Sequence, residues 1–511
     1  MIFPRKTVST AIEADAHSSL RDFLRQHGNR DFPHQLTMAR LIARTLRLER
    51  STLMQTGSSV SKYCLSYLTP ILLGDWSVII VAPDTIQKYL VETEIPQLQK
   101  WLGVNKKVRI GDRWQGDDRL LLTSPQSWLS DRLGSQNDFP AGIPTVIDRA
   151  DDLEEWTREL LTISITAADW DYLVQSLPQS QDLIRDTRIK LTKSIYARPE
   201  NPYRNYVLLA SELELIDNLC QTLANQQLLT GKFQQFWQQV TNKANIAWIS
   251  RDRDRGSLTI NLAPARVNHQ LKPIWQQQPI VIIGSFLDTD AEATTYCERI
   301  GLTSNILTLK FAPNRQNNHI QLYLPDRFPM PNSPDYRQAF LEESLLLVGL
   351  ASRIKGLIVV IADDVPLQGQ VGSSLAGEFG SRVKVEKTDI AKNSILICGW
   401  SFWKQHQESL PVPRLLIIAT LPIPSLENPL VANLVKYYKD RKQDWFRLYL
   451  LPSALKTLEQ TTVPLRESQS IIALLDNRVN FRSYGKTILS ALEPCARINY
   501  IDPTWFGYPN S

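Results

Sequence analysis

The sequence predicts an α/β protein made of two parallel-sheet lobes, with a helical insertion in the first. Three observations lead to this fold class. The chain has 511 residues, more than one hydrophobic core usually serves, so two or three domains are expected. Short apolar, β-branched runs alternate with longer helical patterns. Each run is nearly continuous rather than alternating, which is typical of parallel strands covered by helices on both faces.

The strand candidates form two groups separated by a helix-rich stretch. Several of them end in Asp, Thr, Ser or Pro, and sites in open α/β sheets lie at the carboxyl ends of strands. We therefore expect the polar strand ends to line the site. The first group comprises 77–83, 119–125, 144–148 and 279–285, and the second comprises 356–362, 394–400, 414–420 and 470–476.

These groups set the expected domain boundaries. The stretch between the parts of the first group carries helical patterns such as "DDLEEWTRELL" (151–161) and predicts a helical, arch-like insertion. A Pro- and Asn-rich stretch marks the best linker candidate. The predicted parts are an N-terminal extension (1–30), the first lobe (31–150 and 251–310), the insertion (151–250), the linker (311–336) and the second lobe (337–511).

Composition excludes several classes of protein. Apolar residues make up 43% and charged residues 21% of the chain, as in soluble globular proteins, and a net charge of +5 permits a nucleic-acid partner without indicating one. Neighbouring cysteines lie at least 77 residues apart (Cys220 to Cys297), so no zinc or iron–sulfur spacing and no disulfide framework is expected. The start lacks an apolar signal region, and the longest apolar stretch (345–362) is interrupted by Arg353 and Lys355. We expect a cytoplasmic protein without a membrane span.

Residues 56–63, "TGSSVSKY", have the layout of a phosphate-binding loop between an apolar pair and a helical stretch. Such loops bind phosphate through backbone N–H groups at a helix N-terminus, while a lysine reaches the outer phosphates and a Ser/Thr hydroxyl binds Mg²⁺. Here Ser61 stands where glycine is usual, and Tyr63 stands where the hydroxyl residue is usual. By itself, the stretch fits an ordinary strand–turn–helix with one surface lysine better than it fits a phosphate-binding loop.

A series of further motifs follows this loop in a fixed order, and together they carry a resemblance. The most specific are "SFW" (401–403), "LIIATLPIPSLENPL" (416–430), "LLDNRV" (474–479) and "YGKTIL" (484–489). With "TVIDRADDLEEW" (145–156) and the loop, the chain resembles the DinG/XPD-type superfamily 2 DNA helicases over roughly residues 20–495.

The resemblance implies two RecA-like lobes that close on ATP and Mg²⁺. It implies adenine recognition by Gln35 and a Mg²⁺ ligand at Asp148. It also implies that ATP and Mg²⁺ are the only cofactors to consider, since the four-cysteine iron–sulfur insertion of many relatives is missing. The implied nucleotide-binding residues are Gln35, Gly57, Ser58, Ser59, Ser61 and Lys62.

The charged catalytic positions of the family are altered in this chain. Its D-E-A-H box reads Asp148-Arg149-Ala150-Asp151, and the cation Arg149 cannot activate water as the glutamate does. The family's last motif, Q-G-x-G-R-x-x-R, corresponds to 460–470, which keeps Gln460 and offers Arg466 as a finger candidate. Asp148 and Arg466 are therefore the only catalytic candidates, and both are expected to be vestigial. Altered stretches also replace the T-S-A-T motif (283–287) and the acidic residues after "SFW" (404–407).

Nucleic acid is the expected partner, and two kinds of residue bear on it. Tryptophans and tyrosines can stack unpaired bases, although most are expected in the core or between the lobes. The basic stretch 103–113 gives Lys106, Lys107 and Arg109 as first candidates for phosphate contacts, whereas 251–255 and 436–442 mix bases with acids and read as solvated faces.

The sequence therefore predicts a helicase-family protein that binds single-stranded or branched DNA, with ATP hydrolysis impaired or lost. Such a protein would act as a scaffold beside a repair or replication partner. The alternative is an active ATP-dependent DNA helicase in which Lys62 and Asp148 still serve. A third class, a small-molecule α/β enzyme, lacks a nucleophile–base pair or metal cluster at the strand ends.

Overall fold

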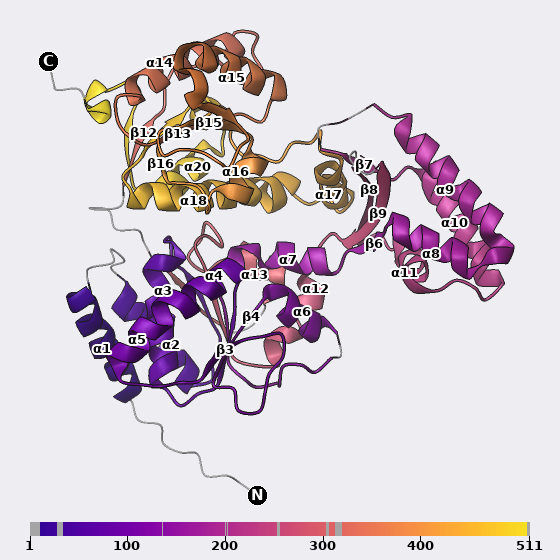
Figure 1. Ribbon diagram of the computed structural model, residues 1–511, viewed down its shortest axis with the longest axis horizontal. Coiled ribbons are helices and arrows are strands. Elements are labelled where there is room, and N and C mark those ends of the chain that lie inside the picture. Colours follow the sequence, from indigo (N-terminus) through magenta and orange to yellow (C-terminus); the bar gives the residue numbers. More distant parts are fainter. Residues whose placement is uncertain are drawn as a thin grey trace, which may run out of the picture.

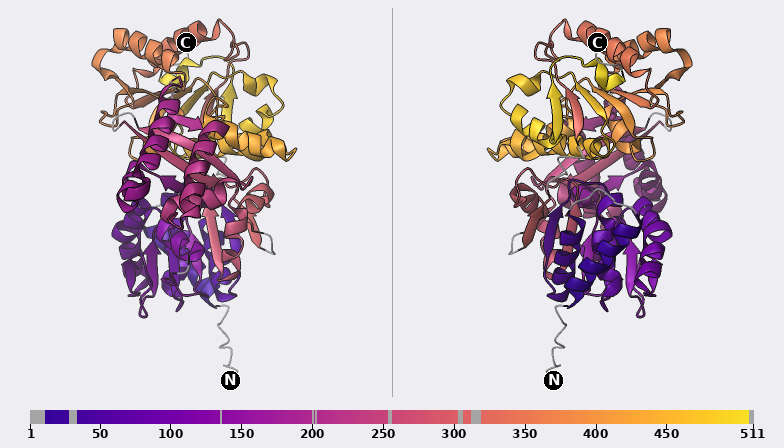
Figure 2. Two further views of the ribbon diagram at one scale, coloured as in Figure 1. Left: turned by 90° about the vertical axis from the view of Figure 1, so that its right-hand side faces the viewer. Right: turned by 90° about the vertical axis from the view of Figure 1, so that its left-hand side faces the viewer.

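The fold comprises two lobes stacked on one another and an insertion beside them (Figure 1). It was obtained as a computed structural model, and the structure describes residues 11–27, 34–134, 136–199, 201, 203–252, 256–302, 306–311 and 319–507. Two side views show the same stacking, with the insertion running alongside both lobes (Figure 2). No helix among these residues is long and apolar enough to cross a membrane.

The first lobe is a seven-stranded, all-parallel sheet in the order β11-β1-β10-β5-β2-β4-β3. All four strands predicted for this lobe are present. The core strand β5 pairs with β10 and β2, so the chain leaves the sheet after β5 and returns at β10. The strands are β1 (Thr52–Gln55), β2 (Val78–Val81), β3 (Val108–Ile110), β4 (Leu120–Thr123), β5 (Thr145–Ile147), β10 (Ile280–Gly284) and β11 (Leu307–Lys310).

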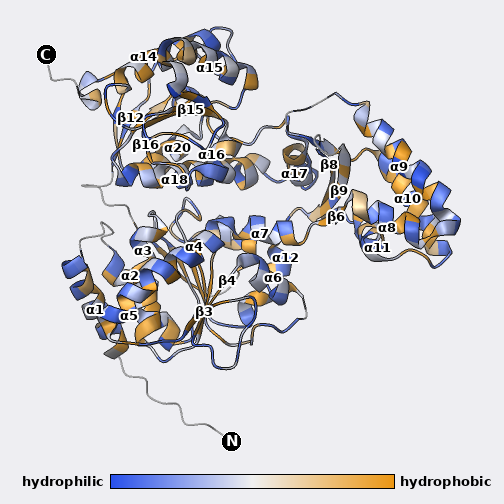
Figure 3. Ribbon diagram, in the orientation of Figure 1, coloured by the Kyte–Doolittle hydropathy of each residue, from blue (hydrophilic) through white to orange (hydrophobic). Residues whose placement is uncertain are grey.

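Helices cover both faces of this sheet, which is why its central strands β10, β5 and β2 are buried and largely apolar (Figure 3). Successive residues of β2 alternate between the two faces: Ile80 packs in one buried cluster and Ile79 in the other. The first cluster is closed by α1 (Ala11–His27), α2 (Gln35–Arg47), α3 (Val60–Leu73) and α5 (Ile95–Leu102). The second is closed by α6 (Pro125–Leu133), α7 (Leu153–Leu160), α12 (Asn268–Leu271) and α13 (Thr294–Ile300).

The second lobe repeats this plan in the order β14-β15-β13-β16-β17-β12-β18, again all parallel. The strands are β12 (Ile320–Tyr323), β13 (Leu357–Ile361), β14 (Val383–Val385), β15 (Ile395–Cys398), β16 (Pro413–Ile418), β17 (Ile471–Leu474) and β18 (Cys495–Ile498). The flanking helices are α14 (Tyr336–Ala351) and α15 (Val365–Phe379) on one face, and α16 (Trp400–His406), α18 (Leu451–Glu467) and α20 (Gly485–Leu492) on the other. The predicted α/β class with two parallel-sheet lobes is confirmed.

The insertion is not purely helical, and it ends later than expected. It has helices α8 (Ala167–Ser176), α9 (Gln181–Tyr196), α10 (Ala210–Asn225) and α11 (Gly231–Val240). It also has a four-stranded antiparallel sheet in the order β6-β9-β8-β7, formed by β6 (Ile163–Ile165), β7 (Asn205–Val207), β8 (Asn245–Asp252) and β9 (Ser257–Pro264). Residues up to 264 therefore leave the first lobe, because β9 pairs along its whole length with β8 rather than with the parallel sheet.

The predicted linker also holds a strand. β12 lies within 311–336 and pairs with both β17 and β18 of the second sheet. Its short apolar run in "HIQLY" (319–323) has polar residues on both sides. The Pro- and Asn-rich composition of the whole stretch therefore predicted a linker. Part of that stretch, 312–318, lies outside the described residues, as do 253–255 of the mixed-charge stretch 251–255.

The insertion packs against α17 (Pro429–Asp440) of the second lobe (Figure 1). Leu434 of α17 lies in one buried cluster with Ile246 of β8. The Asn433 Nδ2 donates to the backbone oxygen of Ala247 at 3.0 Å. The insertion is thus covalently part of the first lobe and packed on the second, so it connects them along one side.

Candidate nucleotide site

The loop at 56–63 has the backbone shape of an anion-binding turn. It leaves the end of β1, and the N–H groups of Thr56 and Gly57 donate to Gly284 and Ser285 at the end of β10. Gly57 adopts a left-handed backbone (φ 58°), which glycine tolerates without strain. Ser59 is the N-cap of α3, a helix of 14 residues, so the positive end of the helix dipole lies at this turn.

The remaining loop residues predicted to bind nucleotide surround this turn. Ser58 is buried, and its N–H lies 3.4 Å from the Thr56 hydroxyl. Ser61 is exposed, and its Oγ lies 3.1 Å from the Oγ of Ser59. Lys62 lies partly buried in the first turn of α3. The buried Gln35 donates from Nε2 to the backbone oxygen of Lys62 at 2.8 Å. The structure therefore brings Gln35 and the loop together, with Gln35 fixing the backbone at Lys62.

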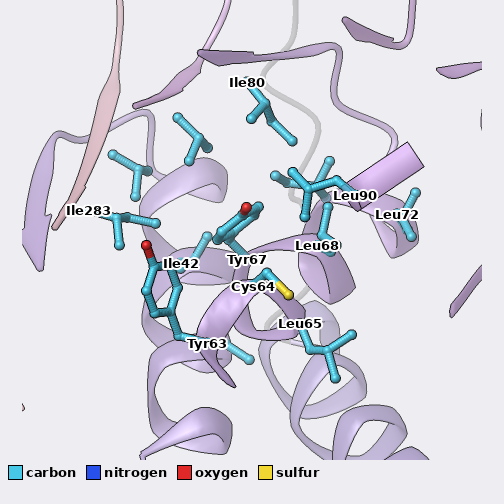
Figure 4. Packing of buried hydrophobic residues seen from close by; sticks show 14 of the residues in the cluster. Ile42, Tyr63, Cys64, Leu65, Tyr67, Leu68, Leu72, Ile80, Leu90 and Ile283 are labelled. Carbon is cyan, nitrogen blue, oxygen red and sulfur yellow. The ribbon is translucent and has the colours of Figure 1, made fainter. Parts of the chain in front are cut away.

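Two tyrosines bind Asp148, the residue that the resemblance implies as the Mg²⁺ ligand. Asp148 follows β5 and is fully buried. Tyr63 donates to its Oδ1 at 2.5 Å and Tyr67 to its Oδ2 at 2.6 Å, and the Arg149 N–H adds a third bond at 2.8 Å. Both tyrosines rise from α3 with their hydroxyl oxygens on the side where Ile80 and Ile283 lie (Figure 4).

Burial governs the protonation of this Tyr–Asp–Tyr cluster. It raises the pKa of Asp148, although the three donated hydrogen bonds and the charge of Arg149 oppose this. It also raises the pKa values of Tyr63 and Tyr67, and the neighbouring Asp148 carboxyl raises them further. Both tyrosines therefore keep their protons and remain donors. Mg²⁺ requires octahedral oxygens at about 2.0–2.1 Å, and an Asp148 carboxylate already bonded by two hydroxyls within an apolar core does not fit that need.

Elsewhere among the described residues, the structure offers no protein-only metal site. Over the described ranges, no set of three or more His, Cys, Asp or Glu side chains could hold a metal ion. The predicted loss of the Mg²⁺ hydroxyl at Tyr63 thus has a structural counterpart, since the substituted side chain takes the acidic ligand for itself. The ATP-bound Mg²⁺ of the resemblance does not match the residues present.

Arg149, which stands at the position of the family's water-activating glutamate, faces the second lobe. It adopts a left-handed backbone (φ 57°). Its guanidinium pairs with Glu408 of the second lobe and lies 3.5 Å from Asp152. Burial lowers the pKa of Arg149, but Glu408 and Asp152 more than offset this and raise it, so the guanidinium stays charged. This side chain binds an acidic partner across the lobes, where an ATPase would hold a base.

Arg466 is not an arginine finger, which corrects its status as a catalytic candidate. It is 1% exposed and forms a bidentate pair with Glu459, at 2.8 and 2.9 Å, within the second lobe. Its Nη2 also donates to the backbone oxygen of Ala491. Both partners belong to the second lobe, so Arg466 ties α18 to the end of α20 and does not reach the loop.

Known proteins resemble this chain in both sequence and structure. The family model described as the helicase C-terminal domain matches residues 387–495. The ATP-dependent DNA helicase YoaA of Escherichia coli (strain K12) is 23% identical over 258 residues, which cover 47% of this chain and 40% of the relative. The chain is similar to the DinG/XPD-type superfamily 2 helicases.

Further similarities agree with this family. YoaA of Haemophilus influenzae is 22% identical over 228 residues, covering 42% of this chain and 36% of the relative, so the chain spans 36–40% of the length of these curated relatives. The solved structure of S. tokodaii Xpd4 has a TM-score of 0.58 at 13% identity and covers 91% of this chain and 99% of that one. An XPD apo structure has a TM-score of 0.60 at 13% identity, covering 90% and 100%. These structures confirm the two-lobe helicase fold.

The segment that follows Asp148 forms ion pairs across the lobe interface. Lys456 of α18 lies 2.5 Å from Asp152 and 3.6 Å from Glu155. Lys404 of α16 lies 2.9 Å from Glu155. Burial lowers the pKa of Lys456, but the carboxylates of Asp152 and Glu155 offset it and raise the pKa. Lys404 belongs to the stretch that replaces the family's acidic residues after "SFW", so two altered motifs pair with one another.

Within the first lobe, Asp151 connects the Asp148 segment to the stretch that replaces the family's T-S-A-T motif. Its carboxylate accepts from the N–H groups of Ser285 and Phe286, at 3.0 and 2.7 Å, and from the Ser285 hydroxyl at 3.0 Å. These hydrogen bonds link the ends of β5 and β10 and lie entirely within the first lobe.

Glu154 in the same segment should make stability depend on pH. Burial would raise its pKa, but Arg299 and Arg158 more than offset burial and lower the pKa from 4.5 to about 2. A carboxyl with a lowered folded-state pKa stabilises the fold above its unfolded-state pKa and loses this contribution as the pH falls through the folded-state value. Wild type should therefore be more stable than Glu154→Gln by roughly 3 kcal/mol at neutral pH. Urea denaturation of both proteins should show this difference in stability shrinking as the pH falls from 4.5 to about 2. A difference that stays constant over this pH range would contradict the prediction. The control is Glu378→Gln, which removes an exposed carboxylate from α15.

The basic residues predicted to contact phosphate are already engaged. Lys106 Nζ donates to the backbone oxygens of Ile71 and Gly74, at 2.6 and 2.8 Å, and burial lowers its pKa to about 8. Lys107 pairs with Asp117, and Arg109 forms a bidentate pair with Asp118. The first caps the end of α3 and the others brace the edge strand β3. Spacing along the sequence could not show these intramolecular partners.

Sequence reasoning missed Tyr67 inside the first lobe, and it missed three residues that make contacts between the lobes. Tyr67 lies one helical turn after Tyr63, and that i, i+4 spacing was the available signal for a second hydroxyl on the same face. Glu408 and Lys456 pair with residues more than 250 positions away, for which the sequence carries no local signal. Glu467 is the third, and its partner is the loop itself.

A cavity of about 340 Å³ lies between the lobes. It is separate from the loop at 56–63, because none of its lining residues belongs to that loop. Aromatic side chains of both lobes line it, and the rings of Phe446 and Tyr484, both in the second lobe, lie 5.0 Å apart. Its main aromatic and basic lining residues are Phe286, Tyr296 and Arg299 from the first lobe, and Phe446, Arg447 and Tyr484 from the second.

Proposed function

We propose that this chain binds single-stranded or branched DNA without hydrolysing ATP, and that it acts as a scaffold in DNA repair or replication. The observation that carries the proposal is the Tyr63–Asp148–Tyr67 cluster. Asp148 is the family's Mg²⁺ ligand, and here both of its oxygens accept hydrogen bonds inside the core. Phosphoryl transfer depends on Mg²⁺, on a residue that positions water and on arginine fingers. Three features support the proposal: the tyrosines bind the oxygens of Asp148, Arg149 stands in place of the residue that positions water, and Arg466 is bonded within the second lobe.

The alternative, an active ATP-dependent helicase, would require Asp148 to leave two hydroxyl donors in an apolar core. Each abandoned hydroxyl would cost about 1–3 kcal/mol. The alternative would also require a base other than Arg149, and the nearby carboxylates Asp152 and Glu155 are bonded to lysines. The geometry favours the scaffold.

DNA is supported as the partner by the family and by the cavity between the lobes. The curated relatives are named as ATP-dependent DNA helicases. The cavity offers aromatic faces for unpaired bases and an exposed cation, Arg447, whose side chain is 77% accessible. We place one base contact at Tyr484, which lies partly exposed beside Phe446.

Replacing Tyr484 with alanine should weaken binding of single-stranded DNA about tenfold, since stacking contributes roughly 1–3 kcal/mol per base. The measurement is fluorescence anisotropy of a labelled oligothymidine, without ATP, at about 50 and 200 mM salt. Wild-type affinity should fall as salt rises, because bound phosphates release counterions. Tyr172→Ala, which removes a 69% exposed tyrosine from the insertion, is the matched control. Salt-independent or undetectable binding by the wild type would refute the DNA-binding proposal, and equal affinities of the Tyr484 and Tyr172 variants would refute the placement.

A further inference from the structure

Glu467 is the last residue of α18, a helix of the second lobe that faces the first lobe. It directly follows Arg466, which the resemblance offered as a finger candidate. Arg466 is bonded within the second lobe, whereas Glu467 makes a contact with the first lobe. A carboxylate, rather than a cation, therefore crosses from the end of α18 to the first lobe.

The carboxylate of Glu467 contacts the loop at 56–63. Glu467 Oε1 accepts from the Ser59 N–H at 3.2 Å, and its two oxygens lie 2.9 and 3.0 Å from the Ser59 hydroxyl. Ser59 is the N-cap of α3, so the carboxylate meets an N–H group at the positive end of that helix. A nucleotide phosphate bound by this loop would need the same donors.

We propose that Glu467 is an internal ligand of the loop, which holds the two lobes together in the absence of nucleotide and excludes a nucleotide phosphate. Three further ion pairs cross the same interface and support closure. They are Arg149–Glu408, Lys456–Asp152 and Lys404–Glu155. Because Glu467 is tethered, its effective concentration at the loop is on the order of millimolar or higher. Its negative charge also repels a polyphosphate placed beside it.

This device goes beyond the proposed function, because lobe closure by Glu467 does not depend on DNA binding. The family mechanism would use nucleotide to bring the lobes together. In this chain a carboxylate of the second lobe, that of Glu467, contacts the loop directly. The closed arrangement thus becomes the resting state, and ATP has no free site through which to change it.

Hydrogen exchange of the loop tests the contact in solution. In wild type, a peptide spanning 56–63 should exchange slowly, whereas Glu467→Gln should exchange about ten- to hundredfold faster, because a charged hydrogen bond of about 1.5–3 kcal/mol is lost. Ser59→Ala, which removes the hydroxyl donor, should change exchange in the same direction. Glu378→Gln removes an exposed carboxylate from the same lobe and should leave the loop unchanged. Equal exchange in wild type and both loop-contact variants would overturn the proposal.

Binding of a fluorescent ATP analogue, measured without DNA, tests the exclusion of phosphate. Glu467→Gln should bind the analogue at least about tenfold tighter than wild type, since the competing charge is removed while the loop donors remain. Wild-type binding as tight as that of the variant would overturn the proposal. Neither assay involves DNA, so failure here leaves the DNA-binding test untouched, and failure of DNA binding leaves these results standing.

Discussion

Replacing Asp148 with alanine should destabilise the first lobe by about 4 kcal/mol, because two buried tyrosine hydroxyls and a backbone N–H lose their acceptor. In a working ATPase this residue binds metal, and its replacement would lower the rate of ATP hydrolysis. Here it is fully buried between Tyr63, Tyr67 and the Arg149 backbone, so its replacement should lower the free energy of unfolding. Urea denaturation followed by tryptophan fluorescence measures the change.

The tyrosines provide an internal check on that prediction. Tyr63→Phe and Tyr67→Phe should each cost about 2 kcal/mol in the wild type, since each removes one hydrogen bond to the carboxyl. In the Asp148→Ala background Tyr63→Phe should cost far less, because the hydroxyl has already lost its partner. Asp117→Ala, at a side chain 71% exposed, is the carboxylate control. If Asp148→Ala proved as stable as Asp117→Ala, the cluster would not be the structural element described here.

The framework of this fold could be predicted from the sequence, because its signals are local. Continuous apolar runs such as 356–362 became central strands with both faces covered, as β13 illustrates. The strand β12 could not be predicted, because its four residues carry no period and gain their place only by pairing with β17 and β18. The antiparallel sheet of the insertion was missed for a related reason, since β8 begins shortly after α11 in a stretch that was predicted to be helical.

The candidate site could be predicted only where its chemistry is written in a motif. The motif positions show that Tyr63 replaces the usual Ser or Thr and that Arg149 replaces the usual glutamate. What replaced those functions could not, because the partners Asp148 and Glu408 are set by three-dimensional packing. Arg466 illustrates the opposite error, since its buried partner Glu459 lies seven residues away and gives no pairing signal by motif.

ATP turnover is expected to be lost, and restoring one catalytic residue should not recover it. Removing metal binding, water activation and the fingers together slows phosphoryl transfer by several orders of magnitude. Arg149→Glu reintroduces the family's glutamate, yet the tyrosines still occupy Asp148 and Glu467 still occupies the loop. The same variant sets a carboxylate against Glu408 and Asp152, so it should also loosen the lobe interface by like-charge repulsion.

The most direct test of this account is the rate of ATP hydrolysis by the wild type, with and without single-stranded DNA, against Lys62→Ala as the baseline. Phosphate release is measured with Mg²⁺ and saturating ATP, and Arg149→Glu is included in the same series. We expect all of these proteins to stay at the baseline under both conditions. DNA-stimulated hydrolysis by the wild type that disappears in Lys62→Ala would contradict the account, and would show that Asp148 leaves its tyrosines to bind metal.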